Sequence, residues 1–148
     1  MVKTIFLFLI ILASILTLIP SAHSQTEKKT VTLPSGEVVC DLTGEWNALY
    51  EHYGPMQWVG DIKSALKITQ QGNMFVGTSL IATPLQPAGT EKIRGELDKD
   101  GIKSFRYNRP GVRCDIDYWE DVKGEMSKNC DKIVFDDDKG VKGILERK

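Results

Sequence analysis

Turn signals divide this chain into short stretches in which apolar and polar residues alternate. Four connections are short: Gln71–Asn73, Asp98–Gly101, Trp119–Glu120 and Asp136–Gly140. Four others are longer and chemically richer: Glu51–Asp61, Thr83–Thr90, Asn108–Gly111 and Ser127–Asp131. An up-and-down meander of strands would gather the short turns at one end and the longer loops at the other. The alternation therefore predicts a cup-shaped β-fold whose mouth is formed by the longer loops.

Most of the stretches between the turns have the two-residue period of half-buried strands. The candidate strands are 42–50, 62–70, 73–82, 91–97, 101–108, 112–118, 121–126, 132–136 and 141–147. Because no apolar stripe with helical spacing follows residue 24, we expect an all-β fold, an antiparallel up-and-down barrel of about eight strands. Direct antiparallel closure requires an even number of strands. Either one short candidate is a loop, or Val31–Leu33 adds a strand, or the barrel is incomplete.

The N-terminus has the parts of a secretory signal peptide. Lys3 precedes an apolar run, Ile5–Ile19, and the small residues Ala22 and Ser24 fit a cleavage site before Gln25. An uncleaved anchor is the alternative, but the run is shorter than the roughly 20 residues that cross a bilayer. We expect residues 1–24 to be removed, so that the protein contacts a membrane only before cleavage and is secreted or periplasmic.

The remaining chain is long enough for one domain. We expect a polar leader over residues 25–40 and a single β-barrel domain over residues 41–148. Removal of Lys3 leaves 18 basic residues (19 minus 1) against 20 acidic residues. This near-neutral balance argues against a nucleic-acid partner, which would require a basic surface.

Three cysteines would enter an oxidising compartment, so a disulfide is expected. In the proposed meander, Cys114 and Cys130 both lie at the mouth, whereas Cys40 lies at the opposite end. We therefore predict a Cys114–Cys130 disulfide and leave Cys40 as either a buried thiol or an intermolecular link. The cysteine spacing has no zinc-ligand pattern, and no metal site is predicted.

Two short motifs carry a family resemblance. The segment 42–46, Leu-Thr-Gly-Glu-Trp, is similar to the start of the first strand in lipocalins and their calycin relatives. The segment 72–78, Gly-Asn-Met-Phe-Val-Gly-Thr, resembles the second hairpin of avidin-like proteins. The resemblance implies a calycin-like barrel in which Trp46 plugs the closed end and a ligand is held inside or at the open end. It also offers Arg147 as the counterpart of an arginine found late in lipocalins.

Candidate binding residues fall into three groups. The first long loop is rich in aromatic and soft side chains suited to contacts with a ligand: Tyr50, His52, Tyr53, Met56 and Trp58. A second group supplies guanidinium forks for a carboxylate or phosphate: Arg106, Arg109 and Arg113. Inward-facing Phe75, Phe105 and Tyr107 are expected to line the interior. The alternatives are a loop that merely covers the core and a solvated basic rim.

Catalysis is not expected from this sequence. His52 is the only histidine after the signal segment, and no nucleophile motif accompanies it. The clustered carboxylates fit turns and a solvated strand face, and no cofactor is predicted. We therefore expect a binding protein rather than an enzyme. Its ligand is a small molecule held in or at the mouth of the barrel, or, alternatively, an extracytoplasmic protein, as for a secreted enzyme inhibitor.

Overall fold

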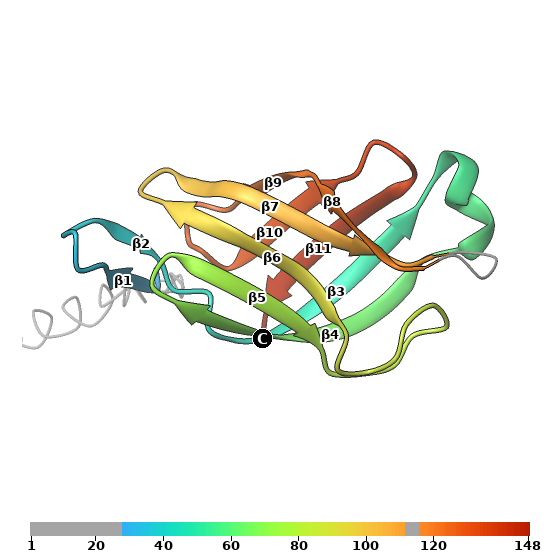
Figure 1. Cartoon of the computed structure of the whole chain (residues 1–148), viewed down its shortest axis with the longest axis horizontal. Coiled ribbons are helices and arrows are strands. Elements are labelled where there is room, and N and C mark those ends of the chain that lie inside the picture. The colour runs from blue at the N-terminus through green and yellow to red at the C-terminus, as the bar shows by residue number, and fades with distance from the viewer. Residues whose placement is uncertain (1–27, 112–115) are drawn as a thin grey trace, which may run out of the picture.

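The structure is a computed structural model that describes residues 28–111 and 116–148 (Figure 1). The described part is built from strands and one short 3-10 helix. Their bounds are β1 (Thr30–Thr32), β2 (Val38–Cys40), β3 (Gly44–His52), η1 (Gly54–Val59), β4 (Ile62–Gln71), β5 (Met74–Ser79), β6 (Glu91–Asp98), β7 (Gly101–Arg109), β8 (Tyr118–Asp121), β9 (Lys123–Met126), β10 (Lys132–Asp136) and β11 (Val141–Arg147). The prediction of an all-β fold is confirmed.

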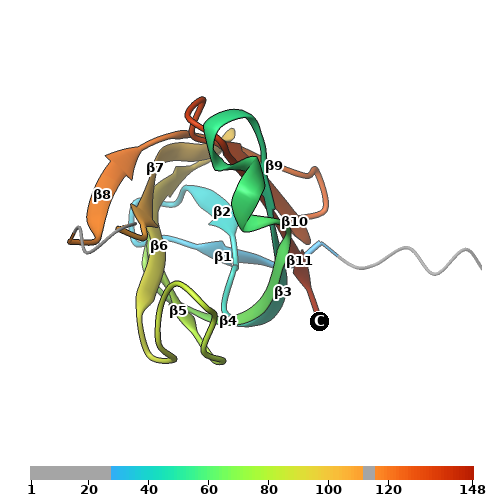
Figure 2. The same cartoon turned by 90° about the vertical axis from the view of Figure 1, so that its right-hand side faces the viewer.

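Strands β3 to β11 form one antiparallel sheet in the order β8-β7-β6-β5-β4-β3-β11-β10-β9. The first of them pairs with the last, from Trp46 opposite Arg147 to His52 opposite Val141. The two edge strands, β8 and β9, are consecutive in the chain and separated only by Val122. The sheet therefore curls into a nearly closed barrel, which Figure 2 shows end-on.

The predicted turn at Trp119–Glu120 is wrong. Both residues belong to β8, where Trp119 lies opposite Asn108 and Glu120 opposite Tyr107. The chain continues in the same direction through β9, which pairs with β10. Residues 118–126 thus act as one kinked strand, which leaves about eight strands around the barrel. The candidate strand 112–118 is not confirmed, because residues 112–115 lie outside the described residues, Ile116 and Asp117 are not in a strand, and only Tyr118 belongs to β8.

Because the chain does not reverse direction at Trp119–Glu120, every later loop lies at the end of the barrel opposite to the predicted one. Loop 127–131 joins the tight turns 71–73 and 99–100 at one end, which we call the closed end. Loop 137–140 joins residues 53–61, 80–90, 110–111 and 116–117 at the other, which we call the mouth end. The expectation that loop 127–131 lies at the mouth and the 136–140 turn opposite it is therefore wrong for both.

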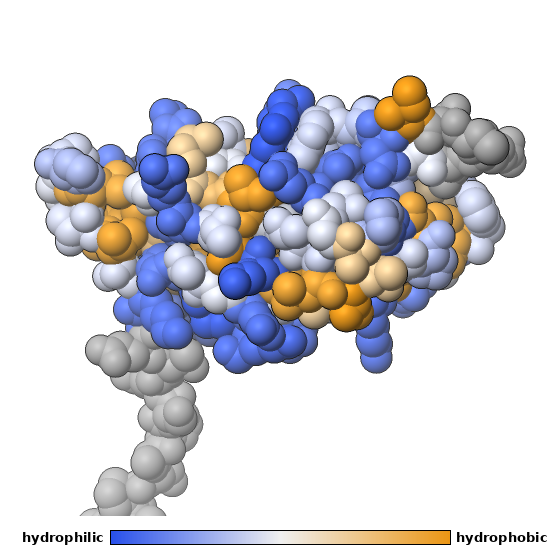
Figure 3. Space-filling view, turned by 60° about the horizontal axis from the view of Figure 1, so that its bottom comes forward, coloured by the Kyte–Doolittle hydropathy of each residue, from blue (hydrophilic) through white to orange (hydrophobic). Residues whose placement is uncertain are grey.

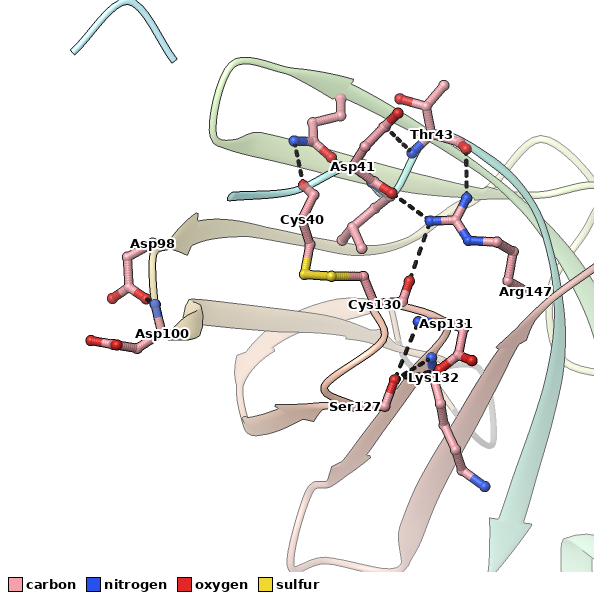
Figure 4. Close-up of a disulfide and its surroundings, with 12 residues drawn as sticks. Cys40, Asp41, Thr43, Asp98, Asp100, Ser127, Cys130, Asp131, Lys132 and Arg147 are labelled. Carbon is pink, nitrogen blue, oxygen red and sulfur yellow. Dashed lines mark hydrogen bonds between the residues drawn. A yellow bond between two sulfur atoms is a disulfide. The ribbon is translucent and has the colours of Figure 1, made fainter. Parts of the chain in front are cut away.

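The disulfide joins Cys40 to Cys130, with their Cα atoms 5.7 Å apart (Figure 4). The predicted Cys114–Cys130 pairing is wrong because it relied on the reversal at Trp119–Glu120, which does not exist. Cys114 lies outside the described residues. Cys40 ends β2, and β1 and β2 form a hairpin within the segment expected to be a polar leader. The disulfide ties this hairpin to the closed end, and Figure 1 shows β1 and β2 lying beside that end of the barrel.

The closed end is sealed by Trp46 and Arg147. The Trp46 ring is fully buried and its Nε1–H donates to the Leu42 carbonyl at 2.9 Å. The Arg147 guanidinium lies 4.8 Å from the centre of that ring and donates to the carbonyl oxygens of Thr43, Asp41 and Cys130 (Figure 4). This one side chain therefore links the last strand, the entry to the first barrel strand and the disulfide loop.

Aromatic side chains fill the barrel above Trp46. Phe105 and Phe135 have ring centres 5.1 Å apart, and Tyr107 lies 5.0 Å from Phe135. Gly143 makes room for this packing, because a Cβ atom there would lie 2.0 Å from the Phe135 ring. The interior of the barrel is therefore a packed core.

Candidate functional site

The first connection of the mouth end carries the helix η1, which begins with Gly54 and Pro55. Proline suits the first turn of a helix because it has no N–H to satisfy there. Met56 turns inward and is 7% exposed, whereas Trp58 is 64% exposed. Met56 therefore helps to cover the core, as one interpretation of the sequence had it. Trp58 presents its indole ring to solvent, where it is available for binding, as the other interpretation had it.

Tyr53 connects the first and last loops of the mouth end. Its hydroxyl donates to the Asp136 carboxylate, and its backbone N–H donates to Gly140 O at 2.9 Å. The hydrogen bond to Asp136 raises the pKa of Tyr53 to about 12. The ring nevertheless remains 39% exposed. Tyr53 is thus held in place at the rim with part of its surface free.

Exposed apolar side chains gather around the mouth end. Of the nine large apolar side chains that are exposed in the described part of the chain, six lie in its loops or at their junctions: Tyr53, Trp58, Leu80, Ile81, Ile116 and Tyr118. We call these six the apolar rim. In Figure 3, hydrophobic surface is visible at the upper right of the molecule and again lower on the same side. They come from three separate connections, which the barrel places at the same end.

The residues expected to line the interior pack against one another. Tyr50, Phe75, Phe105 and Tyr107 are each at most 3% exposed, and His52 is 8% exposed. Ring centres are 6.1 Å apart for Tyr50 and Tyr107 and 5.9 Å apart for Phe75 and Phe105. The cavity that remains at the mouth end has a volume of about 10 Å³. That is space for about one water molecule.

The three predicted arginines do not form one group. Arg106 points outward from β7 and pairs with Asp121 of β8, with its Nε 3.0 Å from the carboxylate. Both of these side chains are exposed, at 38% and 88%. Arg113 lies outside the described residues. Arg106 is therefore part of a solvated strand face.

Arg109 lies in a buried ion-pair cluster. Its guanidinium contacts Asp137, whose side chain is fully buried, and lies 3.5 Å from the carboxylate of Glu120. The ammonium of Lys139 contacts the other carboxylate oxygen of Glu120, and the main-chain carbonyl of Lys139 accepts a hydrogen bond from Arg109. The cluster connects β7, β8 and the loop that precedes β11. Arg109 is thus already occupied by two carboxylates.

Sequence analysis missed Lys92, whose side chain is only 4% exposed. In the pairing of β5 with β6, Gly77 lies opposite Ile93 while the next residue, Thr78, lies opposite Glu91. Lys92 is the extra residue of this β-bulge, and it turns inward together with Ile93. A bulge breaks the two-residue period. The only signal in the sequence was a lysine next to a core isoleucine, which alternation assigns to the outside.

Aromatic rings enclose the ammonium group of Lys92. Its Nζ lies 5.2 Å from the ring centres of both Tyr50 and Tyr107. Its hydrogen-bond acceptor is Oε1 of Gln86, a 4% exposed side chain that donates in turn to the Asp117 carboxylate. Burial lowers the pKa of Lys92 to about 8, against its usual 10.5, and Asp117 opposes this shift.

The lowered pKa predicts a pH dependence of stability. The unfolded chain keeps its lysine protonated up to about pH 10.5, so above about pH 8 it binds more protons than the folded protein. Stability therefore rises with pH between these values, by up to about 3 kcal/mol at 1.36 kcal/mol per pKa unit. Urea unfolding from pH 7 to 10.5 should show wild type gaining this amount relative to Lys92→Met. Lys67→Met, at an exposed site on β4, should run parallel to wild type instead.

A larger hollow lies at the closed end. It has a volume of about 340 Å³ and lies between the β1–β2 hairpin and the tight turns of the barrel. Its wall includes Val38, which is 50% exposed, Met126 and three lysines, Lys28, Lys99 and Lys128. Lys99 is also hydrogen-bonded to the loop of the hairpin, because its backbone N–H donates to the Glu37 carboxylate at 2.7 Å. None of the sequence-based site residues lies there.

Comparisons with known proteins do not assign this protein to a family. No protein-family model, no curated protein and no solved structure matches the chain. Within residues 28–111 and 116–148, no helix is long and apolar enough to cross a membrane. Nor does that part of the chain gather three or more His, Cys, Asp or Glu side chains that could hold a metal ion. The fold and the mouth end define a small antiparallel barrel with a packed interior and an apolar rim.

Proposed function

We propose that this protein is a secreted or periplasmic binding module that docks another extracytoplasmic protein against its apolar rim. The observation that carries the proposal is the concentration of six exposed apolar side chains on loops at one end of a filled barrel. Monomeric soluble proteins rarely expose large contiguous apolar patches unless these bind a partner. Tyr and Trp side chains, which the rim supplies as Tyr53, Trp58 and Tyr118, are the types enriched at binding hot spots.

The extracytoplasmic location is supported by two independent features. The first 24 residues have the composition of a signal peptide. The Cys40–Cys130 disulfide belongs to the oxidising compartments that such a signal leads to.

A calycin-like relationship is supported by the closed end. The Trp46 of the Gly-x-Trp motif is capped by Arg147 from the last strand. The resemblance offered Trp46 as the plug of the closed end and Arg147 as the counterpart of a late lipocalin arginine, and the two side chains are in contact here. In a calycin the opposite end of the barrel is the open, functional one, and here that is the mouth end with the apolar rim.

A test uses variants of exposed residues, which should leave the fold intact. Protein purified from its own source is captured with its partner, and native mass spectrometry measures the complex. Trp58→Ser together with Ile116→Ser should weaken the complex at least tenfold, because hot-spot side chains carry about 2 kcal/mol or more. Met74→Ser, at an exposed apolar residue of the opposite end, should bind as wild type does. Equal capture by the rim variant and wild type would contradict the proposal.

A small molecule held at the mouth is the second candidate. The packed interior favours a ligand at the entrance over one deep in the barrel. The specific observation in its favour is the buried ammonium of Lys92, enclosed by two tyrosine rings. In the same native mass spectra, a retained ligand of low mass and no protein partner would favour this candidate over the first.

A further inference from the structure

The cavity of about 10 Å³ at the mouth end is small and only partly enclosed, and its wall combines apolar and polar side chains. Thr83 and Leu85 of the β5–β6 loop and Pro110 cover it from outside. Its inner wall includes Lys92, Tyr50 and His52. A space of this size holds one particle about as large as a water molecule.

The ammonium of Lys92 is the charged group of this wall. Within the described residues, no carboxylate lies at ion-pair distance from it. Gln86 lies between it and Asp117, whose negative charge raises the pKa of Lys92 but does not offset the effect of burial. Burying a charge without a counter-charge is costly. The bulge in β6 turns this lysine inward, and bulges of this kind often re-aim a side chain beside a functional site.

Two further groups on the same wall lack hydrogen-bond partners. They are the hydroxyl of Tyr50 and Nδ1 of His52, both buried. Buried polar groups are nearly always paired in native proteins, so an unpaired hydroxyl beside an ammonium is unusual. Both can donate a hydrogen bond to the same small acceptor. A neutral water would satisfy the hydroxyl but would bring no charge to Lys92.

We propose that this cavity is a binding site for one small monovalent anion, held by the Lys92 ammonium and the Tyr50 hydroxyl beneath the β5–β6 loop. An anion supplies the counter-charge that Lys92 lacks and the acceptor that Tyr50 lacks. The small volume fits a halide, while a carboxylate would require the β5–β6 loop to move outward. The site is separate from the apolar rim and needs no partner protein.

Chloride is the probe. The unfolding equilibrium constant is measured in urea at pH 7 while sodium gluconate is replaced by sodium chloride at constant ionic strength. Because gluconate is too large for the cavity, chloride should lower the constant by the factor 1 + [Cl⁻]/Kd. A second series, in which acetate replaces gluconate, shows which kind of anion the site prefers. Stabilisation by chloride alone identifies a free halide ion as the ligand. Stronger stabilisation by acetate identifies the carboxylate of a larger ligand.

Matched variants locate the effect. Lys92→Met keeps the apolar stem and should abolish the chloride response, whereas Lys67→Met should retain it. Tyr50→Phe removes only the unpaired hydroxyl and should weaken binding about three- to tenfold, the value of one hydrogen bond. Equal unfolding of wild type in chloride and gluconate would mean that the cavity holds water, and an undiminished response in Lys92→Met would place the anion elsewhere. Either result overturns the proposal, and neither bears on docking at the apolar rim.

A pH series gives an independent readout. Chloride affinity should fall about tenfold per pH unit above about pH 8, where the Lys92 ammonium loses its proton. The other titratable groups that face Lys92 are Tyr50 and His52 on β3, Tyr107 on β7 and Asp117 before β8. Burial raises the pKa of Tyr50 and of Tyr107 well above 10, so neither tyrosine ionises in this range. An affinity that stays constant from pH 7 to 9 would contradict the assignment to Lys92.

Discussion

Replacing both Cys40 and Cys130 with serine should lower the free energy of unfolding by about 4–5 kcal/mol. The bond closes a segment with a sequence separation of 90 residues, and the chain-entropy model gives about this value for a loop of that length. The loss should also free the β1–β2 hairpin, because Cys40 is its last residue. Urea unfolding under non-oxidising conditions measures the change, and hydrogen exchange of residues 30–40 reports on the hairpin.

Cys114→Ser is the matched control for the disulfide. It leaves the Cys40–Cys130 bond intact, and we expect its stability to stay within about 0.5 kcal/mol of wild type. Peptide mapping without reduction should recover the Cys40 and Cys130 peptides as one linked species. A linked peptide that contains Cys114 and Cys130 instead would contradict the topology described for β8 and β9.

Arg109→Met should destabilise the protein by about 3–5 kcal/mol. The substitution keeps much of the side-chain volume but leaves the buried carboxylates of Asp137 and Glu120 without their shared cation, and breaking a buried pair costs this much. Asp137 would keep only its bonds from the backbone N–H groups of the loop before β11. Chemical denaturation at pH 7 measures the loss.

Arg106→Met on the same strand serves as the comparison. Its partner Asp121 is exposed, so the pair is screened by solvent and the change should cost less than about 1 kcal/mol. Similar losses for the two variants would mean that Arg109 is not the centre of the cluster. The difference in stability loss between the two variants distinguishes Arg109, which holds a buried cluster together, from the solvent-exposed Arg106. Both arginines were predicted from the sequence to bind a ligand.

The fold follows largely from local patterns. Strands β10 and β11 begin and end at the predicted residues, and β3 to β7 lie within a few residues of their predicted bounds. These segments alternate regularly and are bounded by Gly, Asp or Asn, so local signals and tertiary structure agree there. Trp46 at the closed end was also expected from its motif.

The errors with the largest consequences arise where a pairing partner overrides a local signal. Trp119 and Glu120 were read as a turn, yet β7 pairs with both, and Glu120 reaches Arg109 from there. A single mistaken reversal inverted every later connection and with it the disulfide assignment. Lys92 was missed because alternation cannot register a bulge, which exists only in relation to the facing strand.

The sequence by itself determined the all-β class, most strand positions and the presence of aromatic and basic side chains in the loops. Periodicity and turn residues are local properties of the chain, so they can be read without a partner strand. Only the tertiary structure decided which end each late loop occupies, which cysteines meet, that Arg109 is already paired and that Lys92 lies inside. Each of these depends on register between strands far apart in the chain, where a shift of one residue turns a side chain from solvent to core.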